Sequence, residues 1–281
     1  MNRALYRTDK VEPGIWQITD VLDDRAYLVV GQHEALLVDT TMGYGNLLTA
    51  VREITNLPLT VVLTHNHYDH SGGAGWFDEV LWPSDELALA ERETERAMRV
   101  YDRLVGNAEL DGSVPFALRD GESPRTSIVQ EGDVFDLGGE MVEAVALPGH
   151  TTGSMGYVVQ GQQVLLSGDA VTPIMCLFLE ESLDIAAYRK TLAKMAGMDF
   201  QRFYTGHHDV PFAKESLASF DACAEFASKD LGMPWRHTML PEYVGTVHLA
   251  PCETEDVDSP DFRALIGPYV PRYKKRAHPR R

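Results

Sequence analysis

The chain is poor in cysteine, in long apolar runs and in positive charge. Its 281 residues include three cysteines, Cys176, Cys223 and Cys252, whose odd number and wide spacing argue against a disulfide framework. No apolar run approaches the roughly 18 residues that a membrane-spanning helix needs. The first ten residues, MNRALYRTDK, are polar and lack the apolar stretch of a secretory signal. These absences predict reduced thiols, no membrane partner and a cytoplasmic location.

Basic residues are also scarce relative to acidic ones. Lys and Arg number 25 against 42 Asp and Glu, so the formal net charge is −17. Duplex nucleic acids and anionic membranes need a basic face, and the charge therefore predicts that neither is a main partner. Residues 271–281, PRYKKRAHPRR, are the exception, and we interpret them as a solvated terminus rather than a docking arm. The remaining composition, 44% hydrophobic and 24% charged, is typical of a globular protein.

The first 65 residues alternate between strand and helix patterns. β-branched and apolar residues separated by turn residues predict three short strands, over 14–19, 26–30 and 35–39. Helical spacing follows over 46–54 and ends before Pro58. The continuous apolar run LTVVLT at 59–64 predicts a strand buried on both faces. This mixture predicts a sheet covered by helices.

The rest of the chain repeats that order coarsely, with strands followed by helices. A charged amphipathic helix over 84–105, capped by Ser84, and a Gly/Pro-rich loop over 107–124 separate the two halves. The second half predicts four strands and two helices: strands over 141–147, 154–159, 163–167 and 203–205, and helices over 183–197 and 214–231. After residue 231 the pattern weakens and predicts loops punctuated by proline.

The segment HNHYDH, directly after the apolar strand, carries the strongest chemical signal. It places His65, His67, Asp69 and His70 within six residues, and a glycine-rich turn follows. His65 and His67 are two residues apart, so they point to the same side of an extended chain. An exposed polar loop is the alternative interpretation, but the pattern would arise in roughly one shuffled chain in a thousand. Imidazole and carboxylate ligands suit zinc, manganese or iron(II), and we predict a metal site here.

Three later positions repeat one arrangement: a strand, a small turn residue and then a metal-ligand type of residue. His150 follows the strand over 141–147, Asp169 follows the strand over 163–167, and His207 follows the strand over 203–205. Each alone is typical of a turn. Together they predict ligands that gather at one sheet edge, which is how open α/β folds build their sites. His208 competes with His207 for the last position.

These segments together resemble the metallo-β-lactamase-fold hydrolases. HNHYDH, LPGHTTGS, LLSGDAV and YTGHH stand in the family's order, and the resemblance covers about residues 12–212. It implies an α+β fold, a four-layer αββα sandwich of two similar halves, with two divalent metal ions, zinc before manganese or iron(II), at the shared edge. The resemblance implies that one ion is bound by His65, His67 and His150, and the other by Asp69, His70 and His207. It also implies that Asp169 binds both ions.

The resemblance also limits which reactions and substrates are expected. Asp169 stands where true β-lactamases carry another residue type, which favours the glyoxalase II and lactonase-like branch. The expected activity is hydrolysis of a small ester, thioester or lactone by a hydroxide held between two metals, with Asp69 orienting it and passing a proton to the leaving group. The apolar segment 171–178 replaces a glycine-rich one, so a glutathione thioester is disfavoured. We expect this segment either to form a pocket wall or to pack in the core. A phosphodiesterase of this fold and a metal-bearing binding or sensing module without efficient turnover are the alternatives.

We expect one domain over 1–281, with a helical insertion about 84–127 and a C-terminal extension about 231–281. Either addition could serve as a lid or as the contact of a homodimer, or be a solvated surface. A small-molecule substrate is the expected partner. Thr64 and Asp39 are candidates for fixing the histidine tautomers. The four remaining histidines outside these motifs are interpreted as surface or core residues: His33, His237, His248 and His278.

Overall fold

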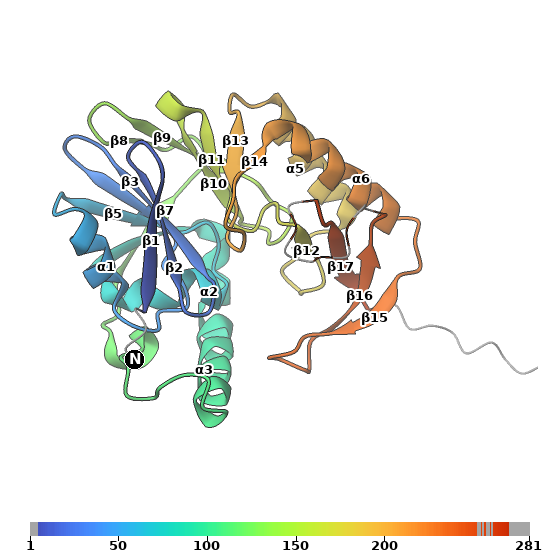
Figure 1. Ribbon diagram of the computed structural model, residues 1–281, viewed down its shortest axis with the longest axis horizontal. Helices are drawn as coiled ribbons and strands as arrows, with labels where there is room; N and C mark the ends of the chain where they lie inside the picture. The colour runs from blue at the N-terminus through green and yellow to red at the C-terminus, as the bar shows by residue number, and fades with distance from the viewer. Residues whose placement is uncertain (1–4, 252–253, 255, 257–258, 260, 270–281) are drawn as a thin grey trace, which may run out of the picture.

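Two β-sheets that pack face to face form the centre of the protein in the computed structural model (Figure 1). The structure describes residues 5–251, 254, 256, 259 and 261–269. The first sheet contains seven strands in chain order: β1 (Tyr6–Glu12), β2 (Ile15–Asp20), β3 (Arg25–Val30), β4 (Ala35–Val38), β5 (Leu59–Val62), β6 (Glu79–Pro83) and β7 (Arg125–Val129). The second has the order β14-β13-β11-β10-β9-β8: β8 (Val134–Asp136), β9 (Met141–Ala146), β10 (Met155–Val159), β11 (Val164–Leu166), β13 (Arg202–Tyr204) and β14 (Phe212–Ala213).

The inner faces of the two sheets share one apolar core. Val29 and Leu36 of the first sheet pack in the same cluster as Val142 and Leu166 of the second. Strands β4, β10 and β11 are buried at every residue, because helices cover the outer faces as well. Burial on both sides explains why these strands show as continuous apolar runs in the sequence.

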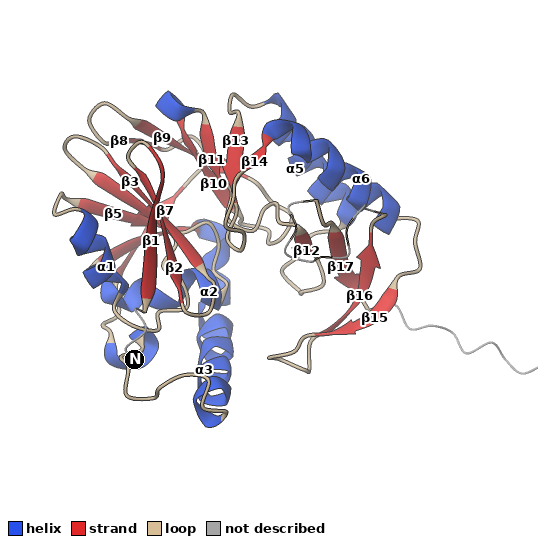
Figure 2. Ribbon diagram, in the orientation of Figure 1, coloured by secondary structure: helices blue, strands red, loops and turns tan. Residues whose placement is uncertain are grey.

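Helices complete the outer layers (Figure 2). Helix α1 (Leu47–Ile54) packs on the first sheet, and its N-cap Asn46 accepts a hydrogen bond from the backbone N of Thr49. Helices α5 (Ile185–Gly197) and α6 (Leu217–Ala227) pack on the second sheet. The resulting order of helix, sheet, sheet and helix confirms the expected four-layer αββα sandwich.

The two halves use the same local topology. In the first, β4 leads through α1 to the parallel strand β5; in the second, β11 leads through α5 to the parallel strand β13. Parallel neighbours present their carboxyl ends at one edge. Two buried tyrosines fasten these ends across the sandwich, since Tyr157 donates to Leu63 O at 2.7 Å and Tyr27 donates to Thr205 O at 2.8 Å.

Several details of the first half differ from the sequence prediction. The polar start of the chain contains β1, which pairs with β2 at the sheet edge. The helix predicted from Ser84 is a 3₁₀ helix η2 (Ser84–Leu89) followed by α3 (Ala90–Gly106), and Ser84 does not cap it. Its hydroxyl bonds to Asp85 instead, while Glu86 turns into the interior. The shorter helical elements, partly within predicted loops or at helix ends, are α2 (Tyr68–Ser71), η1 (Gly72–Trp76), α4 (Ala117–Asp120), η3 (Gln160–Gln162) and η4 (Lys214–Ser216).

The prediction of loops after residue 231 was wrong, because a third sheet forms there. It has four strands in the order β12-β17-β16-β15: β12 (Ile174–Cys176), β15 (Met233–Arg236), β16 (Val244–Leu249) and β17 (Ala264–Pro268). Strand β12 pairs in parallel with β17, and Ile174 lies opposite Ala264. Pairing over 90 residues leaves no local signal, so short strands between prolines look like loops. The basic segment 271–281, Cys252 and His278 lie outside the described residues.

Among the described residues, no helix combines the length and apolarity needed to cross a bilayer.

Helix α3 lies below the first sheet in the view of Figure 1, opposite the hairpin of β15 and β16. Side chains join the two, since Arg99 binds Glu242 at 2.7 Å and Arg103 donates to Met239 O at 3.0 Å.

The shared core supplies the first testable prediction. Leu166 is fully buried between the sheets, so Leu166→Ala is expected to lower the free energy of unfolding by about 2–5 kcal/mol. Leu231 is 87% exposed, and Leu231→Ala is the matched control, with an expected change within about 0.5 kcal/mol. Urea denaturation measures both. Equal effects of the two substitutions would contradict the packing described here.

Candidate metal centre

The seven predicted ligand residues lie at the ends of four strands and come together at one edge of the sandwich. His65 to His70 follow β5 and enter α2, His150 follows β9, Asp169 follows β11 and His207 follows β13. Backbone contacts tie the first loop to its neighbour, because Thr40 N donates to His70 O at 2.7 Å.

Glycines precede two of these residues for steric reasons. A Cβ at Gly206 would lie 2.5 Å from His70 Cε1 and 2.6 Å from Asp169 Oδ1. Gly168 has a φ of +51°, and a Cβ there would lie 2.5 Å from Thr64 Oγ1. The Gly-His and Gly-Asp pairs that marked these turns in the sequence are therefore required by the crowding of the site.

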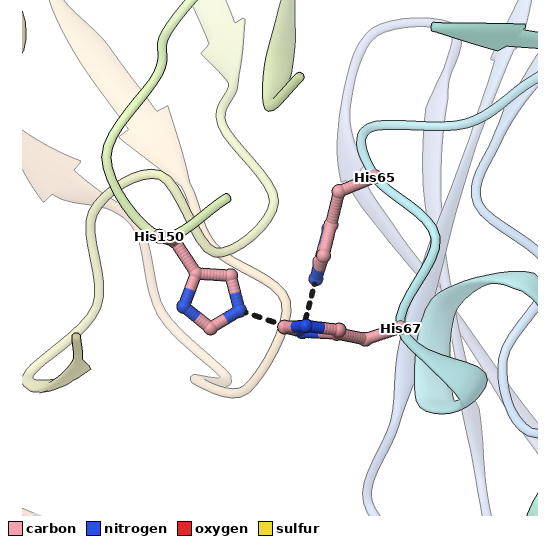
Figure 3. A group of neighbouring side chains, drawn as sticks. All are labelled: His65, His67 and His150. Carbon is pink, nitrogen blue, oxygen red and sulfur yellow. Dashed lines mark hydrogen bonds between the residues drawn. The ribbon is translucent and has the colours of Figure 1, made fainter. Parts of the chain in front are cut away.

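Three histidines form the first cluster, and Figure 3 shows their ring nitrogens converging. His67 Nδ1 lies 3.1 Å from His65 Nε2 and 2.8 Å from His150 Nε2. All three side chains are buried. Three imidazole nitrogens that face one another share too few protons to satisfy every lone pair, whereas one cation between them would do so.

The second cluster combines Asp69, His70 and His207. His207 Nε2 lies 3.3 Å from His70 Nε2 and 3.4 Å from Asp69 Oδ2. Asp169 lies between the clusters, because its oxygens are 3.5 Å from His70 Nε2, 3.3 Å from His207 Nε2 and 3.8 Å from His150 Nε2. The structure thus brings all seven residues together, and their role as metal ligands stays a prediction.

His207, not His208, reaches this centre. The ring of His208 packs against Phe212 with a centroid separation of 5.0 Å, and its Nδ1 lies 3.3 Å from Val210 O. Of the two neighbouring histidines, the structure thus brings His207 to the other candidate ligands, and its role as a ligand stays a prediction.

The ring nitrogens that point away from the centre face oxygen atoms. His65 Nδ1 lies 3.0 Å from Thr64 Oγ1, and His70 Nδ1 lies 2.9 Å from Asp39 Oδ2, as expected for Thr64 and Asp39. The other three pairs are His67 Nε2 with Glu181 Oε1 at 3.0 Å, His150 Nδ1 with Cys176 O at 2.9 Å, and His207 Nδ1 with Asp24 Oδ1 at 3.8 Å. Such partners fix which nitrogen carries the proton and which keeps its lone pair.

The electrostatics differ between the two clusters. Burial lowers the pKa of His150 to about 4, with His67 adding to the effect, and it holds the pKa of His65 well below its usual range. Burial opposes protonation of His70 and His207 too, but the carboxylate of Asp169 raises both pKa values well above the usual range. Burial opposes protonation of His67 as well, but its contact with Glu181 raises the pKa of this ring above the usual value. The first cluster therefore combines two imidazoles that stay neutral with one whose protonation a buried carboxylate favours, while the second cluster combines imidazoles with carboxylates.

Sequence reasoning missed two buried glutamates that brace this centre, Glu86 and Glu181. Glu86 is completely buried and accepts hydrogen bonds from the backbone N of Asn66 and of Gly153, both at 2.9 Å. Gly153 is needed there, because a Cβ would lie 2.6 Å from Glu86 Oε1. Glu86 thus joins the loop that carries His65 and His67 to the loop that carries His150. No local pattern distinguishes Glu86 from the exposed acids around it.

A cavity of about 1050 Å³ opens over both clusters. Five of the seven candidate ligands line it, together with apolar side chains that we call the apolar wall: Ile174, Phe178, Trp235, Leu240 and Ile266. The expected pocket wall in segment 171–178 is therefore present.

One detail of the cavity lining departs from the sequence interpretation, which assigned His237 to the surface or the core. Met175, within the segment 171–178, is buried in the core. His237 does line the cavity, and its Nδ1 accepts from the backbone N of Leu240 at 3.0 Å. Of the other histidines, His33 is exposed and His248 pairs with Asp230 at 3.1 Å.

Comparison with known proteins matches residues 20–207 to the family model described as "Metallo-beta-lactamase superfamily". The human acyl-coenzyme A thioesterase MBLAC2 is 30% identical over 159 residues, which cover 52% of this chain and 57% of that protein. A hydroxyacylglutathione hydrolase from Mesorhizobium japonicum is 27% identical over 57% of this chain and 52% of that protein. The matches thus span little more than half the length of these curated relatives.

Solved structures agree on the fold. A metallo-beta-lactamase family protein from Thermus thermophilus has a TM-score of 0.56 at 22% identity, covering 76% of this chain and 80% of that one. A metallo-beta-lactamase from Pontibacter korlensis has a TM-score of 0.59 at 16% identity, covering 78% of this chain and 99% of that one.

The brace at Glu86 yields the second prediction. In Glu86→Gln an amide NH₂ would face one of the two backbone N–H donors, so the free energy of unfolding should fall by about 1–3 kcal/mol. Glu91→Gln, at an exposed position of α3, is the control and should leave it within about 0.5 kcal/mol. Denaturant unfolding of the metal-free protein measures both. A Glu86→Gln variant as stable as its control would rule out the brace.

Proposed function

The chain belongs to the metallo-beta-lactamase superfamily, and we propose that it acts there as a metal-dependent hydrolase of a small ester, thioester or lactone. The observation that carries the proposal is the convergence of five imidazoles and two carboxylates on one centre that borders a cavity. The thioesterase and hydroxyacylglutathione hydrolase among its relatives support the reaction class.

The residues present fit two divalent ions. Asp169 Oδ1 is buried without a hydrogen-bond partner among the described residues and lies 3.5 Å from His70 Nε2 of the second cluster, while Oδ2 lies 3.8 Å from His150 Nε2 of the first. Cations held by these residues would satisfy the unpartnered oxygen together with the converging nitrogens. We assign His65, His67 and His150 to one ion and Asp69, His70 and His207 to the other, with Asp169 between them. Nitrogen and carboxylate ligands favour zinc, with manganese or iron(II) as alternatives.

The chemistry that such ions supply when bound is polarisation of the scissile carbonyl and a lowered pKa of a nearby water, from about 15.7 towards about 7. The chain's own contribution is to orient the reactants. Asp69 lines the cavity beside His207, where its carboxylate can accept a hydrogen bond from the attacking water. The same oxygen is placed to carry a proton to the leaving group.

The cavity favours an acyl substrate over a phosphodiester. Its apolar wall would accommodate the acyl part of a substrate whose carbonyl lies at the ligand side. The arginines that line it within the described residues are Arg25 and Arg96, and each already binds carboxylates: Arg25 contacts Asp209 at 2.8 Å, and Arg96 contacts Glu181 at 2.9 Å. Neither arginine is therefore available to a phosphate group.

We further propose that the two additions to the core select the substrate within one domain. Helix α3, in the insertion at about 84–127, contributes Glu93 and Arg96 to the cavity. The extension at about 231–281 contributes Trp235, Leu240 and Ile266. Both additions border the same space, so a change in either should alter substrate preference.

Metal removal tests the reaction. The zinc-loaded protein is expected to hydrolyse members of a panel of p-nitrophenyl esters, acyl thioesters and lactones, and to lose this activity with a chelator and regain it with Zn²⁺. His65→Ala should lower kcat/KM at least about 100-fold, because outer partners of a ligand already contribute 10–100-fold. His33→Ala, an exposed histidine outside the site, is the control.

Two results would contradict the proposal. No turnover by the metal-loaded protein, with unchanged substrate binding in His65→Ala, would leave a binding module. An ion-to-chain ratio near one would exclude the two-ion centre.

The apolar wall gives a further prediction. Ile174 is 40% exposed and lines the cavity, so Ile174→Trp should reduce kcat/KM for a long acyl chain about 10-fold or more relative to an acetyl substrate. Ile128 is 38% exposed on β7, and Ile128→Trp should leave that ratio unchanged. If both variants keep the wild-type ratio, the acyl group lies elsewhere.

A further inference from the structure

A buried cluster of charged side chains lies behind the first histidine cluster. Helix α3 supplies Arg92, Glu93 and Arg96, and the loop between β12 and α5 supplies Glu181. Glu93, Arg96 and Glu181 are buried, while Arg92 is partly exposed. Nothing in the sequence motifs assigns a role to these residues.

Glu181 is in direct contact with His67, and the two nitrogens of that ring serve different purposes. Nε2 lies 3.0 Å from Glu181 Oε1, while Nδ1 faces His65 and His150 at 3.1 and 2.8 Å. A carboxylate only accepts hydrogen bonds, so this contact places the ring proton on Nε2. The lone pair is then on Nδ1, the atom that points to the centre of the cluster (Figure 3).

Two arginines and the backbone hold Glu181 in this position. Arg96 Nη1 binds Glu181 Oε1 at 2.9 Å, and Arg92 Nη2 binds Oε2 at 2.5 Å. The backbone O of Glu181 accepts from Thr152 N at 3.1 Å, which fixes its loop to the loop of His150. The carboxylate is therefore fixed relative to both loops of the first cluster.

We propose that Glu181 is a positioning residue that sets His67 as an Nδ1 ligand of the first metal ion, and that Arg96 and Arg92 of α3 hold it in that role. This inference rests on the proposed metal centre. It makes the affinity of one ion, and not the other, depend on a helix of the insertion. His70 and His207 of the second cluster have different outer partners, Asp39 and Asp24.

A third metal site at the same place fits less well. His67, Glu93 and Glu181 do place ligand atoms within 4.8 Å of one another. Arg96 already occupies the space between the two carboxylates, because its Nη1 also donates to Glu93 Oε1. The guanidinium is thus the cation of this cluster.

The test compares Glu181→Gln with Glu180→Gln in the full chain. Glu180 is the neighbouring residue, has a side chain that is 92% exposed and contacts Arg92 at 3.3 Å. A glutamine at 181 can donate its amide N–H to Nε2 and so allow the ring proton onto Nδ1. Competition with a chromophoric chelator for Zn²⁺ should show one of the two ions bound about 10–100-fold more weakly in Glu181→Gln. The other ion, and both ions in Glu180→Gln, should stay within about threefold of wild type.

Arg92→Gln is the second variant, because Arg92 is partly exposed and its loss leaves the buried Arg96 in place. It should weaken the same ion about three- to tenfold, and circular dichroism checks that each variant is folded. Folded Glu181→Gln with wild-type affinity for both ions would overturn the inference, as would an equal loss at both ions. If Glu181→Gln does not fold, the metal affinities of Arg92→Gln decide the inference by the same criteria.

Neither readout depends on turnover. A wild-type protein that binds two ions yet hydrolyses nothing would end the proposed function, while the affinity comparison would still decide the role of Glu181. A wild-type protein that binds no Zn²⁺ would end both.

Discussion

The rest of the structure depends on bringing five imidazoles and two carboxylates together, most of them buried, at one edge of the sandwich. Nitrogen atoms of His65, His67 and His150 face one another at about 3 Å, an arrangement that neutral rings cannot satisfy with their own protons. The arrangement suits the proposed cations inside, and oxygen atoms surround it outside. Asp24, Asp39, Cys176 and Glu181 each contact a different ring. These outer partners come from three parts of the chain, because Cys176 and Glu181 belong to β12 and the loop after it. The contacts that the imidazole rings need therefore determine where the loops carrying these oxygen atoms lie.

The sandwich meets this requirement by using one topology twice. In each half a strand leads through a helix to a parallel strand, and both halves place an aspartate after the first strand: Asp39 directly after β4 and Asp169 three residues after β11. The first of these carboxylates orients His70, and the second faces both clusters. Hydrogen bonds from Tyr27 and Tyr157 across the core hold the two edges in register. Equivalent positions in the two halves thus perform different tasks in one centre.

The sequence predicts what is local and misses what is distant. The candidate ligand residues follow apolar strands and several stand beside glycines, so their positions can be proposed from the sequence alone. The structure brings His207, which follows Gly206, to the other candidates and leaves His208 against Phe212. Strand boundaries are correct to within a few residues for the same reason. Glu86 and Glu181 gain their importance from loops 67 and 114 residues away, and no pattern near them reveals it. The pairing of β12 with β17 spans a similar distance, which is why the third sheet was interpreted as loop.

The insertion and the extension are joined to each other as well as to the cavity, and one side chain connects them to the metal centre. Arg96 of α3 donates to Tyr243 OH at 2.6 Å and to Glu181 Oε1 at 2.9 Å. Tyr243 belongs to the turn between β15 and β16 that lines the cavity, and Glu181 contacts His67. A buried guanidinium has a fixed fork of donors, so a shift of the turn must either move Arg96 or break one of its contacts. The turn that lines the cavity and His67 of the first cluster are consequently connected through one hydrogen-bond network.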